Sequence, residues 1–249
     1  MKVRKQRLDS LLLQRGLAES RTQAQALILA GQVLVGDQRA DKPGSLVAVD
    51  APLRLKERLR YVSRGGLKLE RALAAFELDV NGKICADIGS STGGFTDCLL
   101  QAGAQKVYAV DVGHGQLHPR LLADPRVVAR EGVNARYLSE ADLPEQVDTA
   151  TVDVSFISLT QVLPAVLPRL RPGGLLIALV KPQFEVGRSK VAKGGVVKDS
   201  SAREGAVEKI AAFLSGEGFE LLGRVDSPIA GPAGNVEVLL AARKPSRHA

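Results

Sequence analysis

From residue 83 onward, short apolar runs alternate with segments whose apolar residues recur at helical spacing. The runs predict strands at 84–88, 107–110, 127–129, 149–152, 175–180, 220–225 and 236–241. The segments between them predict helices at 94–102, 117–123, 159–170 and 201–217. Such alternation is typical of a mostly parallel, doubly wound α/β sheet. Only a loop rich in proline and glycine separates the last two runs, so they predict a hairpin whose final strand is antiparallel.

The first 55 residues follow a different pattern. Leucines at 8, 11, 12 and 13 predict a short helix that Gly16 ends. Ser20 is a favourable N-cap for a second helix, and Gly31 fits the left-handed position that follows a helix. Short apolar runs at 33–35, 46–49 and 53–55 predict small strands. A small α+β module therefore precedes the larger sheet.

The charged stretch 56–64 has no sustained period and marks the boundary between these two patterns. We expect an amino-terminal domain at 1–59, a linker at 60–64 and a second domain at 65–249. Gly65 and Gly66 open a predicted helix that carries Lys68.

Basic residues concentrate in the first quarter of the chain, which carries the whole net charge of +7. Residues 1–64 hold 13 Lys/Arg and 6 Asp/Glu, whereas residues 65–249 hold 21 of each. A basic block of domain size predicts a phosphate-rich partner. A solubility tail is the alternative, but this segment has regular apolar positions that a tail lacks.

Several features place the protein in the cytoplasm. No apolar run reaches the length of about 18 residues that a membrane-spanning helix needs. The basic start leads into no apolar signal segment, and Cys85 and Cys98 lack the spacing of metal ligands. We therefore expect reduced thiols, no metal and no membrane association.

A glycine-rich turn follows the first predicted strand and precedes a helix, at 85–95. Ligands bind at this edge of such sheets, and glycines let the backbone approach them closely. Gly89 followed by Gly93 and Gly94 does not match the spacing of a dinucleotide fingerprint. Asp111 ends the second strand and is a candidate acceptor for ribose hydroxyls, with a helix N-cap as the alternative. Asn134 follows the third strand, where an adenine would lie.

Three more candidates lie at the strand ends or faces of the same sheet. Asp153 and Lys181 each follow a predicted strand, and Glu237 lies inside an apolar strand. A buried carboxylate there requires a cationic partner. For Lys181 alone, a surface lysine extended over apolar residues is the alternative. The segment after Asp153 lacks the Asn/Asp-Pro-Pro-Tyr/Phe pattern of methyltransferases that act on nitrogen.

The order of residues at 7–55 resembles the RNA-binding domain of ribosomal protein S4. Arg7-Leu8-Asp9, Gly16, Ser20-Arg21, Gly31 and Lys42-Pro43 carry the resemblance. It implies that basic side chains contact structured RNA by shape and phosphate. The RNA-binding candidates are Arg4, Lys5, Arg7, Arg21, Arg64, Arg188 and Lys190. The last two belong to 181–198, for which we expect either a mobile loop that closes over RNA or a plain solvated loop.

The second domain resembles the FtsJ-type ribose methyltransferases, and the whole chain resembles the TlyA family. The resemblance rests on the blocks Ser63–Leu69, Asp87–Thr96, Asp153–Ser158 and Lys181–Glu185. It implies a Rossmann-like class I methyltransferase fold, S-adenosylmethionine as cofactor, and ribosomal RNA in subunits or particles as partner. The implied cofactor residues are Asp87, Gly89, Ser90, Ser91, Gly93, Gly94, Phe95, Asp111 and Asn134. The implied catalytic set is Lys68, Asp153, Lys181 and Glu237.

The resemblance also implies a reaction, methylation of a cytidine ribose 2'-hydroxyl. Lys181 is the candidate base, Lys68 the neighbouring cation, and Asp153 and Glu237 the carboxylates that orient both amines. Three alternatives stay open: methylation of a base, an RNA-binding protein with an inactive methyltransferase fold, and a membrane-lytic haemolysin, as the family's older name suggests.

Overall fold

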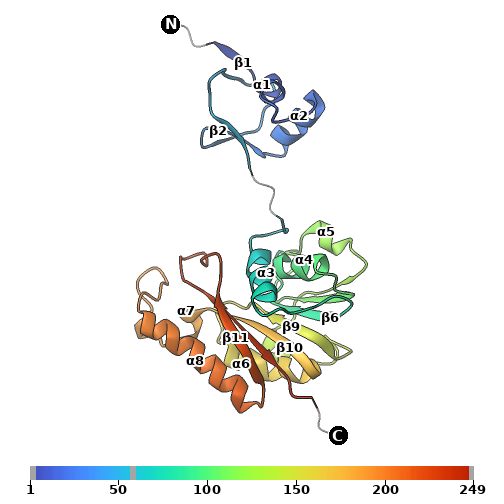
Figure 1. Cartoon of the computed structure of the whole chain (residues 1–249), viewed down its shortest axis with the longest axis vertical. Coiled ribbons are helices and arrows are strands. Elements are labelled where there is room, and N and C mark those ends of the chain that lie inside the picture. Colours follow the sequence, from blue (N-terminus) through green and yellow to red (C-terminus); the bar gives the residue numbers. More distant parts are fainter. Residues whose placement is uncertain (1–3, 57–59, 247–249) are drawn as a thin grey trace. The chain divides into compact units, whose positions relative to one another are not determined.

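The structure is a computed structural model that describes residues 4–56 and 60–246 (Figure 1). The chain divides into two compact units, Met1–Leu59 and Arg60–Ala249. Within the described residues, no helix is long and apolar enough to cross a membrane.

The first unit is a small α+β module. Two helices, α1 (Leu8–Gln14) and α2 (Arg21–Leu29), are followed by short strands. The strands are β1 (Lys5–Arg7), β2 (Val33–Val35), β3 (Gln38–Ala40), β4 (Leu46–Ala48) and β5 (Leu53–Leu55). Strand β1 pairs with β4, and β2 lies between β3 and β5, all antiparallel. The sequence missed β1 and β3, each of which is three residues long.

The predicted helix boundaries of this unit are confirmed by their caps. The Ser20 hydroxyl accepts a hydrogen bond from the Gln23 N–H at 3.1 Å. Gly31 has a φ of 65°, the left-handed conformation that a residue after a helix commonly adopts. The apolar faces of both helices and of β2 meet in a core that includes Leu8, Leu12 and Ile28.

The second unit is built on a seven-stranded sheet. Its strands are β6 (Ile84–Ile88), β7 (Lys106–Val110), β8 (Val127–Arg130), β9 (Val147–Val152), β10 (Leu170–Val180), β11 (Glu220–Asp226) and β12 (Val238–Arg243). They lie in the order β11-β12-β10-β9-β6-β7-β8. Strands β6 to β10 are parallel, and β12 runs antiparallel to both β10 and β11. The predicted α/β fold with a reversed final strand is confirmed.

Helices cover both faces of this sheet (Figure 1). The helices of the second unit are α3 (Gly65–Ala75), α4 (Gly94–Gln101), α5 (Pro119–Leu122), α6 (Leu159–Val166), α7 (Pro182–Glu185) and α8 (Ser200–Gly216). Short 3-10 turns lie at Ala135–Tyr137, Leu167–Arg169 and Arg188–Lys190. Alternate residues of β10 enter opposite cores: Leu176 packs with α6 and α8, and Ile177 packs with α3 and α4. A strand buried on both faces is what a parallel sheet requires.

The predicted end of the helix before β10 and the predicted start of β10 are both wrong. The helix expected at 159–170 ends at Val166, and β10 begins at Leu170 instead of 175. Pro172, Gly173 and Gly174 favour a break in the sequence pattern. In the structure, a register shift between Leu170 and Leu175 absorbs these residues within the strand.

The segment 60–64 belongs to the second unit and is hydrogen-bonded to its helix α4. The Val62 N–H donates to Oδ2 of Asp97 at 2.8 Å, and Gln101 donates to the Arg60 carbonyl at 3.0 Å. The Tyr61 ring fills the space beside Gly66, where a Cβ would lie 2.3 Å from the ring. These residues therefore fold with α4 and the start of α3.

Candidate active site

The glycine turn after β6 brings the backbone close to the end of β9. Gly89 has a φ of 85°, and a Cβ there would lie 2.4 Å from the backbone oxygen of Asp153. Gly94 opens α4, and a Cβ there would lie 2.9 Å from the Gly66 nitrogen. Only glycine fits at these two contacts, so the turn, the start of α3 and the end of β9 meet closely.

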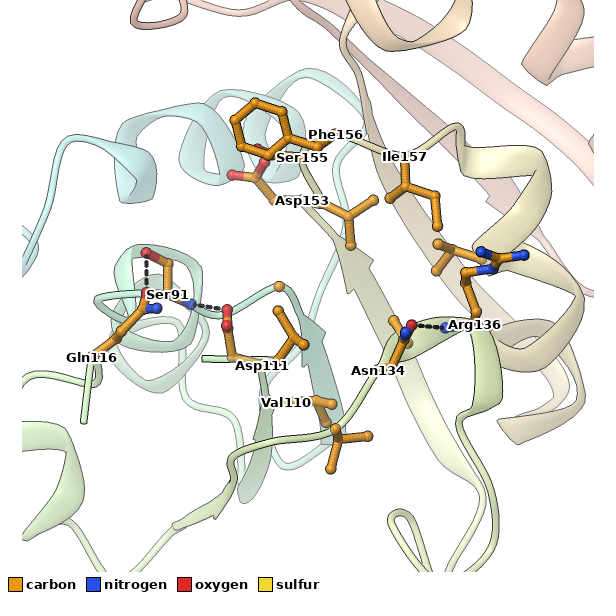
Figure 2. Close-up of a pocket in the computed structure, with 16 residues that line it drawn as sticks. Ser91, Val110, Asp111, Gln116, Asn134, Arg136, Asp153, Ser155, Phe156 and Ile157 are labelled. Atoms are coloured by element: carbon orange, nitrogen blue, oxygen red, sulfur yellow. Dashed lines mark hydrogen bonds between the residues drawn. The ribbon is translucent and has the colours of Figure 1, made fainter. Parts of the chain in front are cut away.

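A cavity of about 540 Å³ opens beside this turn (Figure 2). Its volume is within the range of small-molecule sites. The carboxyl ends of β6, β7 and β9 and the loop after β8 form its walls. The lining includes Gly89, Ser91, Val110, Asp111, Gln116, Asn134, Arg136, Asp153, Ser155 and Phe156.

A second cavity of about 120 Å³ shares one wall with the first. Gly89, Ser91 and Asp153 line both. The smaller cavity adds three further predicted residues, Ser90, Gly94 and Phe95, together with Ser63 and Gly65 from the region before and at the start of α3. The glycine turn and Asp153 thus separate a larger pocket from a smaller one.

Asp111 fixes the turn from the end of β7. One carboxylate oxygen accepts the Ser91 N–H at 2.8 Å (Figure 2), and the other accepts the Gly113 N–H at 2.7 Å. A carboxylate has about four lone-pair sites, so Asp111, which lines the cavity, keeps further acceptor capacity. The helix-cap alternative is wrong, because His118 caps the helix that follows.

Asn134 begins the 3-10 turn beside the cavity. Its Oδ1 accepts the Arg136 N–H at 3.1 Å (Figure 2). The residue lines the larger cavity on the side of β8. Its contact with an adenine stays a prediction.

Asp87 and Gly93 lie behind the turn, outside the lining of both cavities. Oδ2 of Asp87 accepts the Thr96 hydroxyl at 2.7 Å, and Oδ1 accepts the Thr151 hydroxyl at 3.1 Å. Burial raises the pKa of Asp87 to about 7, although both hydroxyls oppose the shift. Asp87 therefore joins β6, α4 and β9. Gly93 has a φ of 94° and packs against Leu121.

The four reactive candidates form two ion pairs. Nζ of Lys68 lies 2.5 Å from Oε2 of Glu237, and Nζ of Lys181 lies 2.6 Å from Oδ1 of Asp153. The side chains of the first pair are 10% and 1% exposed, and those of the second are 11% and 20% exposed. The cationic partner expected for the buried Glu237 is thereby confirmed.

The expected arrangement of these four residues changes in two respects. Glu237 immediately precedes β12 and does not lie inside the strand. Among the described residues, no hydrogen bond or ion pair joins one pair to the other, so each carboxylate orients one amine rather than both. The residue type at each position left this pairing open, because both acids can pair with both lysines.

Lys181 makes its aligned hydrogen bond to a residue that sequence reasoning passed over. Nζ donates to Oγ of Ser155 at 2.8 Å, whereas Oδ1 of Asp153 is buried and has no hydrogen-bond partner despite the close ion pair. Phe156, next in the chain, is 91% exposed with a φ of 65°, and its ring centroid lies 5.2 Å from that of Phe184. Ser155 and Phe156 both lie in the block Asp153–Ser158, but a serine and a phenylalanine at these positions indicated no role from sequence alone.

In the first unit, a buried carboxylate orients two of the predicted RNA-binding residues. Asp9 is fully buried and accepts hydrogen bonds from Arg7 at 2.8 and 3.0 Å and from Arg21 at 3.3 Å. The hydrogen bond from Arg7 is the main cause that holds the pKa of Asp9 below its usual range. The two guanidinium groups are held together and stay about half exposed.

The other predicted RNA-binding residues are less constrained. Arg4, Lys5, Arg64 and Lys190 are exposed. The side chain of Arg188 lies outside the described part of the structure. Part of the expected loop at 181–198 is helical, since α7 and a 3-10 turn lie within it. Over the described residues, no group of three or more His, Cys, Asp and Glu is placed to hold a metal ion.

The strand order, the glycine turn and the carboxylate at the end of β7 define an α/β methyltransferase. Residues 61–244 match the FtsJ-like methyltransferase family, and residues 6–51 match the S4 domain. The chain therefore belongs to the FtsJ-like methyltransferases and carries an S4 domain at its amino end.

Individual relatives cover nearly the whole chain. YqxC of Bacillus subtilis, named as a candidate rRNA methyltransferase, is 50% identical over 96% of this chain and 86% of its own. The 16S/23S rRNA (cytidine-2'-O)-methyltransferase TlyA of Mycobacterium tuberculosis is 45% identical over 96% of this chain and 90% of its own. A solved structure from Streptococcus thermophilus, described as a candidate hemolysin, is 47% identical, with a TM-score of 0.74 over 98% of this chain and 90% of its own. The predicted family and enzyme class are confirmed.

The raised pKa of Asp87 predicts how stability depends on pH. Between the ordinary pKa of 3.8 and about 7, the folded protein keeps a proton that the unfolded chain releases, so stability falls as pH rises through this window. Replacing Asp87 with Asn removes this dependence. The unfolding free energy of Asp87→Asn minus that of the wild type should therefore rise by roughly 1–4 kcal/mol from about pH 5 to about pH 8.

Urea unfolding followed by tyrosine fluorescence measures this difference in the second unit, because Tyr61, Tyr108 and Tyr137 all belong to it. Glu140→Gln, in an exposed ion pair with Arg169, is the matched control and should follow the wild type. A pH-independent difference between Asp87→Asn and the wild type would contradict the prediction.

Proposed function

We propose that this protein transfers a methyl group from S-adenosylmethionine to the ribose 2'-hydroxyl of a cytidine in ribosomal RNA. The observation that carries the proposal is the ion pair of Lys181 and Asp153 at the shared wall of the two cavities. The name of the M. tuberculosis relative gives the same reaction and supports the choice of cytidine.

The larger cavity fits the cofactor. Asp111 is held at its wall with acceptor capacity for ribose hydroxyls, and Gly89 allows close backbone approach. When bound, S-adenosylmethionine supplies an electrophilic methyl group on its sulfonium, and the sulfur leaves with the bonding electron pair. Asp153 then lies between the cofactor cavity and the smaller pocket.

Lys181 is the group that takes the hydroxyl proton. Ser155 and Asp153 fix its Nζ from two sides, at 2.8 and 2.6 Å. In the proposed step Lys181 first releases the ammonium proton of its ion pair to solvent, and the neutral amine then accepts the hydroxyl proton as the ribose oxygen becomes a nucleophile. Alignment of that oxygen with the methyl carbon supplies much of the rate. The buried pair of Lys68 and Glu237 holds α3 against the same edge of the sheet.

Three features favour RNA ribose over other acceptors. The residues after Asp153 lack the motif of methyltransferases that act on amino nitrogens. Phe156 projects from the cavity wall with most of its ring exposed, as a platform for an unstacked base requires. The paired guanidinium groups of Arg7 and Arg21 in the S4 domain supply sequence-independent phosphate contacts.

Replacement of Lys181 by Ala should abolish methyl transfer while S-adenosylmethionine still binds, because Lys181 is not part of the cofactor cavity lining. Radiolabelled methyl transfer to ribosomal particles measures the first effect, and calorimetry measures the second. Nucleoside mass spectrometry of wild-type product should identify 2'-O-methylcytidine. Turnover by Lys181→Ala at the wild-type rate would remove Lys181 from the mechanism, and a methylated base would refute the ribose assignment.

Replacement of Asp111 by Ala should weaken S-adenosylmethionine binding roughly 10- to 100-fold. The substitution leaves two backbone N–H groups without their acceptor and removes the proposed acceptor for the ribose hydroxyls. Calorimetric titration gives the dissociation constant directly. Glu140→Gln, whose side chain is 82% exposed, serves as the control. An unchanged dissociation constant for Asp111→Ala would place the cofactor elsewhere.

The double substitution of Arg7 and Arg21 by Gln should lower RNA affinity at every sequence and reduce the salt slope of binding by about two. Filter binding of ribosomal RNA across a salt series measures both. Arg54→Gln is a matched control, because Arg54 pairs with the exposed Asp37 in the same domain. An unchanged slope in the double variant would exclude phosphate contacts by this pair.

A further inference from the structure

We propose that Glu185 is a positioning residue for methyl transfer, which fixes Lys181 by tying α7 to the segment 153–159. This inference rests on the function proposed above and adds a residue that does not touch the reacting atoms. The Glu185 side chain is 1% exposed, so its contacts are made entirely within the protein.

Three groups from two other segments meet at this carboxylate. Oε2 accepts the Ser158 hydroxyl at 2.5 Å, and Oε1 accepts the Leu159 N–H at 2.7 Å, at the start of α6. Nζ of Lys209, from α8, lies 3.0 Å from Oε2 and donates to the Glu185 carbonyl at 3.1 Å. Lys209 thereby supplies the counter-charge that a buried carboxylate requires.

Capping of α6 does not by itself account for Glu185. Ser158 is the N-cap of α6, and its own hydroxyl oxygen accepts the Thr160 N–H at 3.3 Å. The added effect of Glu185 is a connection between α6 and α7, which are separated by the whole of β10 in the chain.

Lys181 and Glu185 lie at opposite ends of one short helix. Lys181 is the N-cap of α7, and Glu185 is its last residue. A helix of four residues has almost no stability of its own, so its orientation depends on tertiary contacts. A shift at Glu185 therefore displaces Lys181.

The two segments are joined at three successive points. At one end Lys181 contacts Asp153 and Ser155. In the middle the rings of Phe184 and Phe156 pack at 5.2 Å. At the other end Glu185 binds Ser158 and Leu159. The contact at Glu185, whose side chain is 1% exposed, is more deeply buried than the ion pair of Lys181 and Asp153, whose side chains are 11% and 20% exposed. It therefore contributes most to the alignment of the other two.

Single-turnover methyl transfer by the full-length protein tests this role. Glu185→Ala should lower the rate constant about 10- to 100-fold, since a displacement near 1 Å at a catalytic group has such an effect. The dissociation constant for S-adenosylmethionine and the KM for ribosomal particles should change by less than about threefold, because Glu185 is buried and lines neither cavity. Glu185→Gln keeps an acceptor for the Leu159 N–H and should restore most of the rate, even where the alanine variant folds poorly.

Glu208→Gln is the matched control, because Glu208 lies on α8 one residue before Lys209 and pairs with Arg224 at the surface. It should keep the wild-type rate. A wild-type rate in Glu185→Ala, or a rate loss no larger than the loss of cofactor affinity, would overturn the positioning role alone. Absence of any methyl transfer by the wild-type protein would overturn the proposed function as well.

Discussion

The buried ion pair of Lys68 and Glu237 is the interaction on which the arrangement of the second unit depends. It joins residues 169 positions apart, the first turn of α3 and the residue before β12. A carboxylate with 1% exposure is costly without a cation, so α3 must lie where its first turn reaches the start of β12. That placement sets Gly65 and Gly66 against Gly94 at the start of α4.

The same close packing joins the two halves of the proposed reaction. Gly89 allows the turn after β6 to approach the backbone of Asp153, whose N–H donates to the Ile88 carbonyl at 2.8 Å. The backbone of Asp153 is therefore in direct contact with the turn that lines the larger cavity. A side chain at Gly89 would displace both, so neither the cavity nor the Lys181 pair is independent of the other.

Elements with a strong period were predictable from sequence, and contacts between segments were not. The alternation of β6 to β10 with helices fixes a parallel sheet, and Asp111 was found because it ends a strand beside the glycine turn. Strand β10 was misplaced at its start because its proline and glycines imitate a loop. Ser155 and Glu185 were missed because their importance comes from partners 26 or more residues away, which no local pattern encodes.

The difference between the two ion pairs explains why Lys68 and Lys181 have different proposed roles. Lys68 and Glu237 are both almost fully buried, and neither lines the larger cavity, so the pair is suited to hold the fold. Lys181 is bound to two residues that do line that cavity. Each carboxylate keeps one oxygen without an aligned hydrogen bond, but in Asp153 it is the oxygen that faces Lys181, whereas Lys68 is hydrogen-bonded to the other oxygen of Glu237. An amine held by one aligned hydrogen bond and one loosely aligned ion pair is free to exchange the carboxylate contact for a substrate hydroxyl. The geometry therefore favours Lys181 over Lys68 as the proton acceptor, and it makes the contacts that orient α7 part of the catalytic arrangement.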